Sequence, residues 1–153
     1  MYHAKRKIMK GQDVLFSSGN DSWSTPRQIF DDLDKEFKFD FDPCPLNTNP
    51  KLTGTLFDTD DSPEPFDGLI EEWGESNFVN PPYSDITAWM YKADIEWKKG
   101  KKIVLLVPSR TDTKWFHKYC LPNAKEIRFC KGRLKFGFSK NSAPFPSMII
   151  IFE

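Results

Sequence analysis

The chemistry that this chain could carry is concentrated in the tetrapeptide Asn80-Pro81-Pro82-Tyr83. Two consecutive prolines fix the backbone φ angle at two positions, remove two N–H donors and push the preceding residue toward an extended conformation. The result is a rigid turn whose carbonyl groups are not committed to a helix or a sheet. Asn80 adds a side-chain carbonyl, and Tyr83 adds a flat aromatic face. Acceptors beside a stacking face suit a flat heterocycle that carries an exocyclic amino group.

This turn lies between a predicted strand and a predicted helix. The apolar run 77–79 precedes it, and residues from about Asp85 onward have helical periodicity that Gly100 is expected to stop. The turn therefore follows the carboxyl end of a strand, where open α/β sheets bind their ligands. The residues expected on the buried face of the helix are Ile86, Trp89, Met90, Ala93 and Trp97.

The remaining elements predict an α/β fold. We expect a first helix with Thr25 as its N-cap and Pro26 at its first position, then a strand over 37–42 that ends at Pro43. Later strands are predicted over 102–107, 124–130 and 147–152, with a helix over 113–120 and a hairpin over 132–138. Short elements are expected over 55–57 (strand) and 69–73 (helix). Alternating strands and helices favour a largely parallel central sheet with flanking helices.

Length and composition indicate one domain in a reducing compartment. The chain has 153 residues, 15% of them aromatic, and we expect a tail over 1–21 followed by a single domain over 22–153. Its three cysteines have no CxxC spacing, and no histidine lies at metal-ligand spacing, so neither a disulfide framework nor a metal site is predicted. No apolar run is long enough to span a membrane. We expect a cytoplasmic protein without membrane attachment.

The formal net charge is zero, but the charges are unevenly distributed. Residues 1–80 hold 8 Lys and Arg against 16 Asp and Glu, whereas residues 81–153 hold 14 against 6. A basic half of this kind can bind a polyanion, although segregated solvated charges are also common. The best candidates for nucleic-acid contact are Arg128, Lys131, Arg133 and Lys135, which alternate with aromatic residues. The alternative is an edge strand protected by its lysines.

Three landmarks together resemble a known family. Trp23-Ser24-Thr25-Pro26 precedes the first predicted helix, Asp42-Pro43-Cys44 ends the next strand, and the Asn-Pro-Pro-Tyr turn follows a later one. This order resembles the S-adenosylmethionine-dependent N6-adenine DNA methyltransferases of the short phage and prophage type, over roughly residues 22–152. The resemblance implies an abbreviated Rossmann-like fold, double-stranded DNA as substrate, a bacterial host cell as location and no stable protein partner.

The resemblance also assigns roles to individual residues. It implies that Asn80, Pro81, Pro82 and Tyr83 hold the target adenine. It implies that Trp23, Thr25, Pro26, Asp42, Pro43 and the backbone of Asn80 bind S-adenosylmethionine. Each has a structural alternative, because Thr25-Pro26 is a sufficient helix start, Trp23 could pack against that helix, and Asp42 could cap a turn.

One departure from the usual methyltransferase pattern leaves other functions open. Most methyltransferases carry a glycine-rich loop after the first strand, whereas Asp42 is followed by Pro43-Cys44-Pro45-Leu46-Asn47. Asn-Pro-Pro-Tyr also occurs in enzymes that methylate RNA bases or glutamine side chains of proteins. A nucleic-acid-binding module that keeps an inactive methyltransferase fold is a third possibility.

Overall fold

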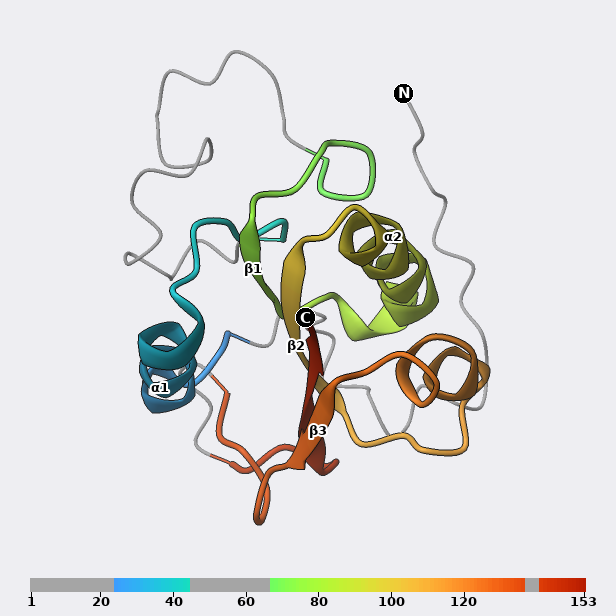
Figure 1. Cartoon of the computed structure of the whole chain (residues 1–153). Helices are drawn as coiled ribbons and strands as arrows, with labels where there is room; N and C mark the ends of the chain where they lie inside the picture. The colour runs from blue at the N-terminus through green and yellow to red at the C-terminus, as the bar shows by residue number, and fades with distance from the viewer. Residues whose placement is uncertain (1–23, 45–66, 137–140) are drawn as a thin grey trace.

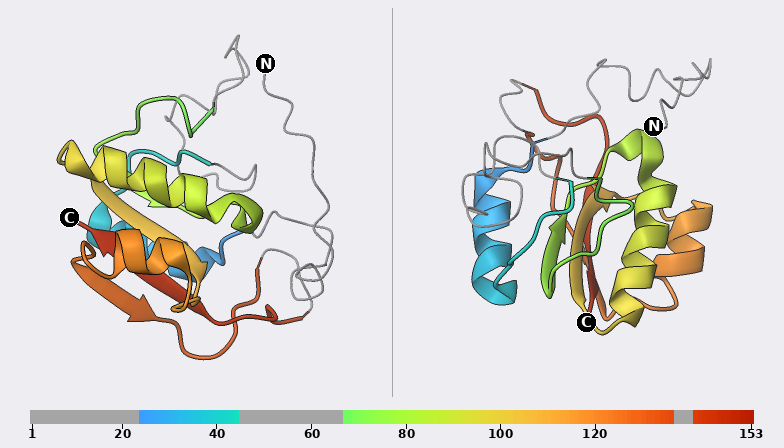
Figure 2. Two further views of the ribbon diagram at one scale, coloured as in Figure 1. Left: turned by 90° about the vertical axis from the view of Figure 1, so that its right-hand side faces the viewer. Right: turned by 90° about the horizontal axis from the view of Figure 1, so that it is seen from above.

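A four-stranded sheet lies between helices on both of its faces in the computed structural model (Figure 1). The structure describes residues 24–44, 67–136 and 141–153, so Trp23 and the strand predicted over 55–57 lie outside the described residues. Helix α1 (Arg27–Phe37) covers one face. Helix α2 (Ile86–Lys98) and the π-helical turn η4 (Phe116–Cys120) cover the other, as Figure 2 shows from above. In these ranges no helix is long and apolar enough to cross a membrane.

The sheet has the strand order β1-β2-β4-β3. The strands are β1 (Ser76–Val79), β2 (Lys102–Pro108), β3 (Glu126–Phe129) and β4 (Ser147–Phe152). β1 pairs with β2 in parallel, and β4 is antiparallel to both β2 and β3. The α/β class is confirmed, but the expectation of a largely parallel sheet is wrong for the described pairs. β1, β2 and β3 do run in one direction. β4 follows β3 in the chain and inserts between β2 and β3 in the opposite direction, which makes two of the three pairings of these strands antiparallel.

The first helix begins one residue later than predicted. Pro26 is its N-cap and no side chain caps it, because the Thr25 hydroxyl accepts a hydrogen bond from Asn80 instead. The strand predicted over 37–42 is also wrong. Phe37 is the last residue of α1, and Lys38 ends the helix in a left-handed conformation. Asp40 N and Phe41 N both donate to the Ser76 carbonyl, but this segment forms one isolated parallel bridge, Phe41 to Asn77, and no strand.

Two further predicted elements differ from the structure. Residues 68–70 form a hydrogen-bonded turn closed onto the Asp67 carbonyl rather than a helix. The described part of 132–138 has no strand. It belongs to the long return from β3 to β4, in which Ala143 N donates to the Leu134 carbonyl at 2.7 Å. By contrast, 102–107, 147–152 and the helix starting near Asp85, preceded by the 3-10 turn η3 (Tyr83–Asp85), are confirmed.

Each face of the sheet packs its own apolar cluster. Along β2 and β4, alternate residues point to opposite faces, and both faces are covered, which explains why these strands are continuous apolar runs. The α1 side buries Phe30, Leu33, Phe37, Phe78, Val104, Leu106, Phe136, Phe145, Ile149 and Ile151. The α2 side buries Val79, Trp89, Met90, Ala93, Leu105, Val107, Phe116, Met148, Ile150 and Phe152, with Trp73 beside them.

A buried carboxylate fixes the end of α2 that lies farthest from the Asn-Pro-Pro-Tyr turn. Glu96 is 0% exposed and contacts Lys92, Lys99 and Lys101 at 2.8, 3.1 and 2.7 Å. It also accepts a hydrogen bond from Trp73 N at 3.4 Å. Burial alone would raise the pKa of Glu96, but the hydrogen bonds from the three lysines outweigh it and hold that pKa at about 2. This network joins α2 and the start of β2 to the segment 67–75.

We expect Glu96→Ala to lower the free energy of unfolding by about 3–5 kcal/mol, because removing one member of a buried ion pair leaves the others uncompensated. Denaturant unfolding measures the loss. The control is Lys35→Ala, whose partner Asp32 is exposed, and it should change the same quantity by less than about 1 kcal/mol. A loss for Glu96→Ala no larger than that of the control would remove the network from the account of stability.

Candidate active site

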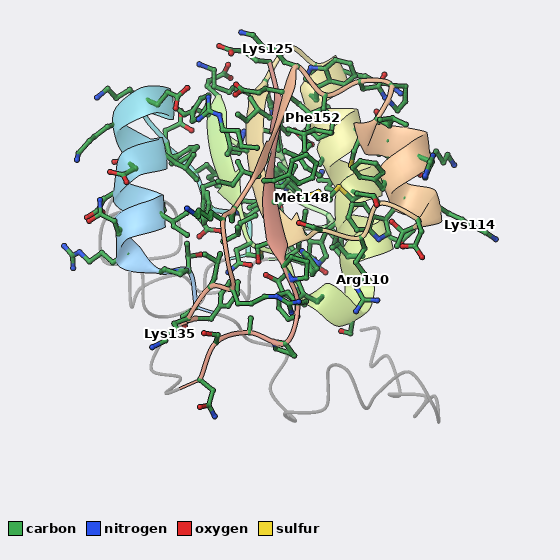
Figure 3. All side chains as sticks on the ribbon, turned by 90° about the horizontal axis from the view of Figure 1, so that it is seen from below. Arg110, Lys114, Lys125, Lys135, Met148 and Phe152 are labelled. Atoms are coloured by element: carbon green, nitrogen blue, oxygen red, sulfur yellow. The ribbon has the colours of Figure 1, made fainter. Side chains whose placement is uncertain are left out.

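The Asn-Pro-Pro-Tyr turn lies at the end of the sheet where the carboxyl ends of β1, β2 and β3 meet. Val79 pairs with Leu105, and Pro108 pairs with Ser147 at the start of β4. Residues that follow the three strands are therefore gathered at one end of the molecule. In Figure 3, Lys135 and Arg110 lie toward this end, and Phe152 and Lys125 lie toward the other.

Asn80 joins the turn to the start of α1. It is 5% exposed, and its Nδ2 donates a hydrogen bond to the Thr25 hydroxyl at 3.0 Å. The oxygen and nitrogen of an amide diverge from one carbon, so a nitrogen held by Thr25 turns the oxygen in another direction. The contact spans 55 residues of sequence and sets the orientation of the one side-chain amide in the turn.

The residues that follow Phe41 pack against the same turn from a second side. Cys44 Sγ donates to the Asn80 carbonyl at 3.3 Å, and Cys44 N donates to Asp42 Oδ1 at 3.0 Å. Asp42 is 4% exposed and forms no ion pair with the described residues. Burial raises the pKa of Asp42 to about 7, although the hydrogen bond from Cys44 opposes the rise. Burial, and then the charge of Asp42, raise the pKa of the Cys44 thiol.

Tyr83 begins η3 and packs against the return from β3 to β4. Its ring meets Phe145 edge-on at 5.2 Å and Phe136 at 6.4 Å, measured between ring centroids. Its hydroxyl is buried and has no hydrogen-bond partner among the described residues. Burial raises the pKa of this phenol, so it stays protonated. Tyr83 is therefore held by its ring rather than by its hydroxyl.

The four basic candidates divide into two kinds. Arg128 donates to both carboxylate oxygens of Glu36 at 2.7 Å and to Glu126 at 2.7 Å, so its guanidinium already joins β3 to α1. The other three side chains, Lys131, Arg133 and Lys135, are exposed and form no ion pair within the described ranges. Leu134 and Phe136 alternate with them and pack inward. A single segment thus presents cations to solvent and aromatic surface to Tyr83.

The structure brings together most of the residues expected to act together. Thr25, Asp42, Asn80 and Tyr83 lie around one turn through the contacts above, and Pro43 lies between Asp42 and Cys44 in the chain. Sequence reasoning noted Cys44 beside Asp42 but gave it no contact, and it missed the residues against Tyr83 and Pro43. Phe145 lies between two prolines, Pro144 and Pro146, without any periodic pattern to mark it, and Gly68 gave no signal.

Comparison with known proteins identifies the family of the chain. Residues 13–153 match the family described as DNA N-6-adenine-methyltransferase (Dam). The chain belongs to this family. It is 31% identical over 146 residues to a DNA N-6-adenine-methyltransferase of Haemophilus phage HP1 (strain HP1c1), with 89% of this chain and 80% of that protein covered. The resemblance to phage-type enzymes is confirmed.

A second relative of this Dam-family chain covers it less completely. The chain is 30% identical over 110 residues to a DNA N-6-adenine-methyltransferase of Escherichia phage T1, with 70% of this chain but 43% of that protein covered. No solved structure matches the chain significantly.

Among the residues of this Dam-family site, Asp42 gives the strongest reason to expect a bound ligand. A carboxylate taken out of water is costly unless hydrogen bonds or a cation compensate it. One backbone N–H is the compensation that the described residues supply. A polar ligand with hydroxyl groups or a cationic group would supply more, and Thr25 and the Asn80 backbone lie on the other side of the same turn.

We expect the stability of the protein to fall as pH rises from about 4 to about 7 because of Asp42. Its pKa is raised from the ordinary 3.8 to about 7, so the folded state binds more protons than the unfolded state in this window, and stability declines with pH there. Asp42→Asn should remove that decline, which urea unfolding at several pH values measures. Asp112→Asn, in the exposed turn after β2, is the charge-matched control. An unchanged pH dependence in Asp42→Asn would show that the carboxylate is not desolvated.

Proposed function

We propose that the protein transfers a methyl group from S-adenosylmethionine to N6 of adenine in double-stranded DNA, in the cytoplasm of a phage-infected or lysogenic host. The observation that carries this proposal is the Asn80 amide, fixed by Thr25 inside an Asn-Pro-Pro-Tyr turn at the carboxyl end of β1. The three codirectional strands with helices on both faces support an abbreviated Rossmann-like fold. The relatives from phages HP1 and T1 carry the same activity in their names.

The turn addresses the main obstacle to this reaction. The adenine amino group is a poor nucleophile because its lone pair is delocalised into the ring. The Asn80 Oδ1 and the Pro81 carbonyl can accept its two protons, which favours a pyramidal nitrogen with its lone pair directed outward. Neutral acceptors are sufficient, because the proton can leave after transfer. Positioning then supplies most of the rate enhancement.

The residues beside the turn fit the methyl donor. When bound, S-adenosylmethionine would supply an electrophilic methyl group on a sulfonium. Asp42 would accept hydrogen bonds from hydroxyl groups or compensate positive charge, and Thr25, Pro26, Pro43 and the Asn80 backbone would line the remainder. The donor set of one buried carboxylate, one hydroxyl and backbone carbonyls matches a polar nucleoside carrying an amino acid. Trp23 stays part of this prediction.

The base must leave the duplex to reach the turn. Tyr83 would stack on it, and base–aromatic stacking of about 1–3 kcal/mol offsets part of the cost of extrusion. The hydroxyl has no hydrogen-bond partner among the described residues, so we assign the role of Tyr83 to its ring. The segment that packs on Tyr83 carries three exposed cations, Lys131, Arg133 and Lys135, which would contact the DNA phosphates. Arg128 would contribute mainly by holding β3 to α1.

The decisive assay incubates the full chain with DNA and S-adenosylmethionine labelled on the methyl group, then digests the DNA to nucleosides. The proposal predicts that the label appears in N6-methyl-2′-deoxyadenosine. Label in RNA or in a glutamine of a protein substrate, with none in DNA, would overturn the choice of substrate. Cofactor binding by calorimetry without transfer to any of the three would instead indicate an inactive binding module.

We expect Asn80→Ala to abolish methyl transfer while cofactor affinity stays close to that of the wild type, since its side chain is assigned to the base. Tyr83→Phe should be mild and Tyr83→Ala severe, because the ring is packed and the hydroxyl bonds to none of the described residues. Single-turnover methylation at saturating cofactor measures the rates of all three variants, and calorimetry measures the cofactor affinity of Asn80→Ala. Equal losses in the two Tyr83 variants would point to a role for the hydroxyl.

Replacing Arg133 and Lys135 by Ala should weaken DNA binding and flatten its salt dependence by roughly two units of slope, one for each phosphate contact released. Fluorescence anisotropy across salt concentrations measures the slope. The control removes the same charge at the opposite end of the sheet with Lys98→Ala and Lys125→Ala, on the last residue of α2 and just before β3. If both double variants keep the wild-type slope, the DNA surface lies elsewhere.

A further inference from the structure

We propose that Gly68 is a positioning residue of the candidate active site. It comes from a separate segment and seats the Asp42–Cys44 turn against Asn80. The inference rests on the proposed function, since it assigns a role within that site. It also explains how a turn without glycine can lie so close to other backbone.

The backbone at Gly68 touches the backbone of Pro43. A Cβ atom added at Gly68 would lie 1.9 Å from the Pro43 carbonyl oxygen and 2.8 Å from the Trp89 ring. Non-bonded heavy atoms prefer about 3.5–4.0 Å, and a carbonyl held in the chain cannot swing aside as a side-chain end can. Glycine is therefore required here by close approach rather than by an unusual φ angle.

Gly68 is fixed by a hydrogen bond to a buried residue, so it cannot move away to relieve a clash with Pro43. Its carbonyl accepts a hydrogen bond from Trp73 Nε1 at 2.6 Å, and Trp73 is 3% exposed and stacks on Trp89. The Trp73 backbone is fixed in turn, because its carbonyl accepts from Lys101 Nζ at 2.6 Å and its N–H donates to Glu96. The buried carboxylate of Glu96, at the far end of α2, thus holds Trp73 in place, and Trp73 holds Gly68.

On the other side of the contact, movement of Pro43 reaches the site directly. Pro43 lies between Asp42 and Cys44, which are joined by a 3.0 Å hydrogen bond. Cys44 Sγ holds the Asn80 carbonyl. A displaced Pro43 carbonyl would therefore release the thiol and shift the carboxylate.

The test compares Gly68→Ala with Gly100→Ala. Gly100 has φ +94° and open space around its Cβ position, so its substitution strains the end of α2 without reaching the site. The first measurement is the rate at which iodoacetamide alkylates Cys44, resolved by mass spectrometry, with Cys120 as the internal reference. The second is the dissociation constant of S-adenosylmethionine. Thermal unfolding reports the general loss of stability in each variant.

We expect Gly68→Ala to raise the alkylation of Cys44 relative to Cys120 and to weaken cofactor binding on the order of tenfold. Gly100→Ala should lower stability and change neither. Wild-type values of both measurements in a destabilised Gly68→Ala protein would reduce Gly68 to a structural residue and overturn the inference.

Two further outcomes are covered. If Gly68→Ala does not fold, Trp73→Phe deletes the donor to the Gly68 carbonyl and leaves a smaller aromatic ring in place of the indole, and it should raise Cys44 alkylation in the same direction. Unchanged alkylation there would contradict the inference. If the wild-type protein binds no S-adenosylmethionine, the proposed function fails, and the alkylation ratio still decides the role of Gly68.

Discussion

The geometry of the site depends on how Asn80 is held. The Asn80 side-chain nitrogen donates a hydrogen bond to the Thr25 hydroxyl, just before α1. The Asn80 backbone carbonyl accepts a hydrogen bond from the thiol of Cys44, two residues after Asp42. Three segments that are far apart in sequence therefore converge on one residue at the end of β1. The two prolines that follow remove backbone freedom and N–H donors, so the turn has few other ways to settle. Any change that moves Asn80 moves the proposed base and cofactor contacts together.

Contacts that begin at the opposite end of α2 also help to hold this site in place. The buried Glu96 accepts from three lysines and from Trp73 N, and Trp73 supports the Gly68 carbonyl. A buried ion cluster adds little net stability compared with apolar packing, but it specifies one arrangement strongly, because a misplaced partner leaves a charge uncompensated.

Sequence patterns predicted the elements that are buried on both faces, and missed what depends on contacts between distant segments. The runs 102–107 and 147–152 are strands because continuous apolar character is typical of a covered sheet. Alternation over 37–42 predicted a strand, yet α1 extends through Phe37, and the rest of the segment forms one isolated bridge, from Phe41 to Asn77. Direction of pairing was not readable either, since nothing local tells β4 to insert between β2 and β3.

The residues proposed for the site lie close together, although parts of the fold around them differ from the prediction. Asn80, Thr25 and Asp42 were chosen from motif order, and the structure places them around one turn. The role of the Thr25 hydroxyl was misassigned, because its position before Pro26 matches a helix cap, and only the tertiary contact diverts it to Asn80. Gly68 could not be predicted, since its need for a bare backbone arises from Pro43, 25 residues earlier in the chain.

The most direct measurement of the central claim is the single-turnover methylation rate of Thr25→Val against Thr25→Ser at saturating cofactor and DNA. Valine matches threonine in shape and removes the acceptor for Asn80 Nδ2, whereas serine keeps it. The account predicts a rate for Thr25→Val that is lower by about tenfold to a hundredfold, the size expected when a reacting group loses its alignment. Thr25→Ser should stay close to the wild type. Wild-type rates in both variants would show that Thr25 does not orient Asn80 for catalysis.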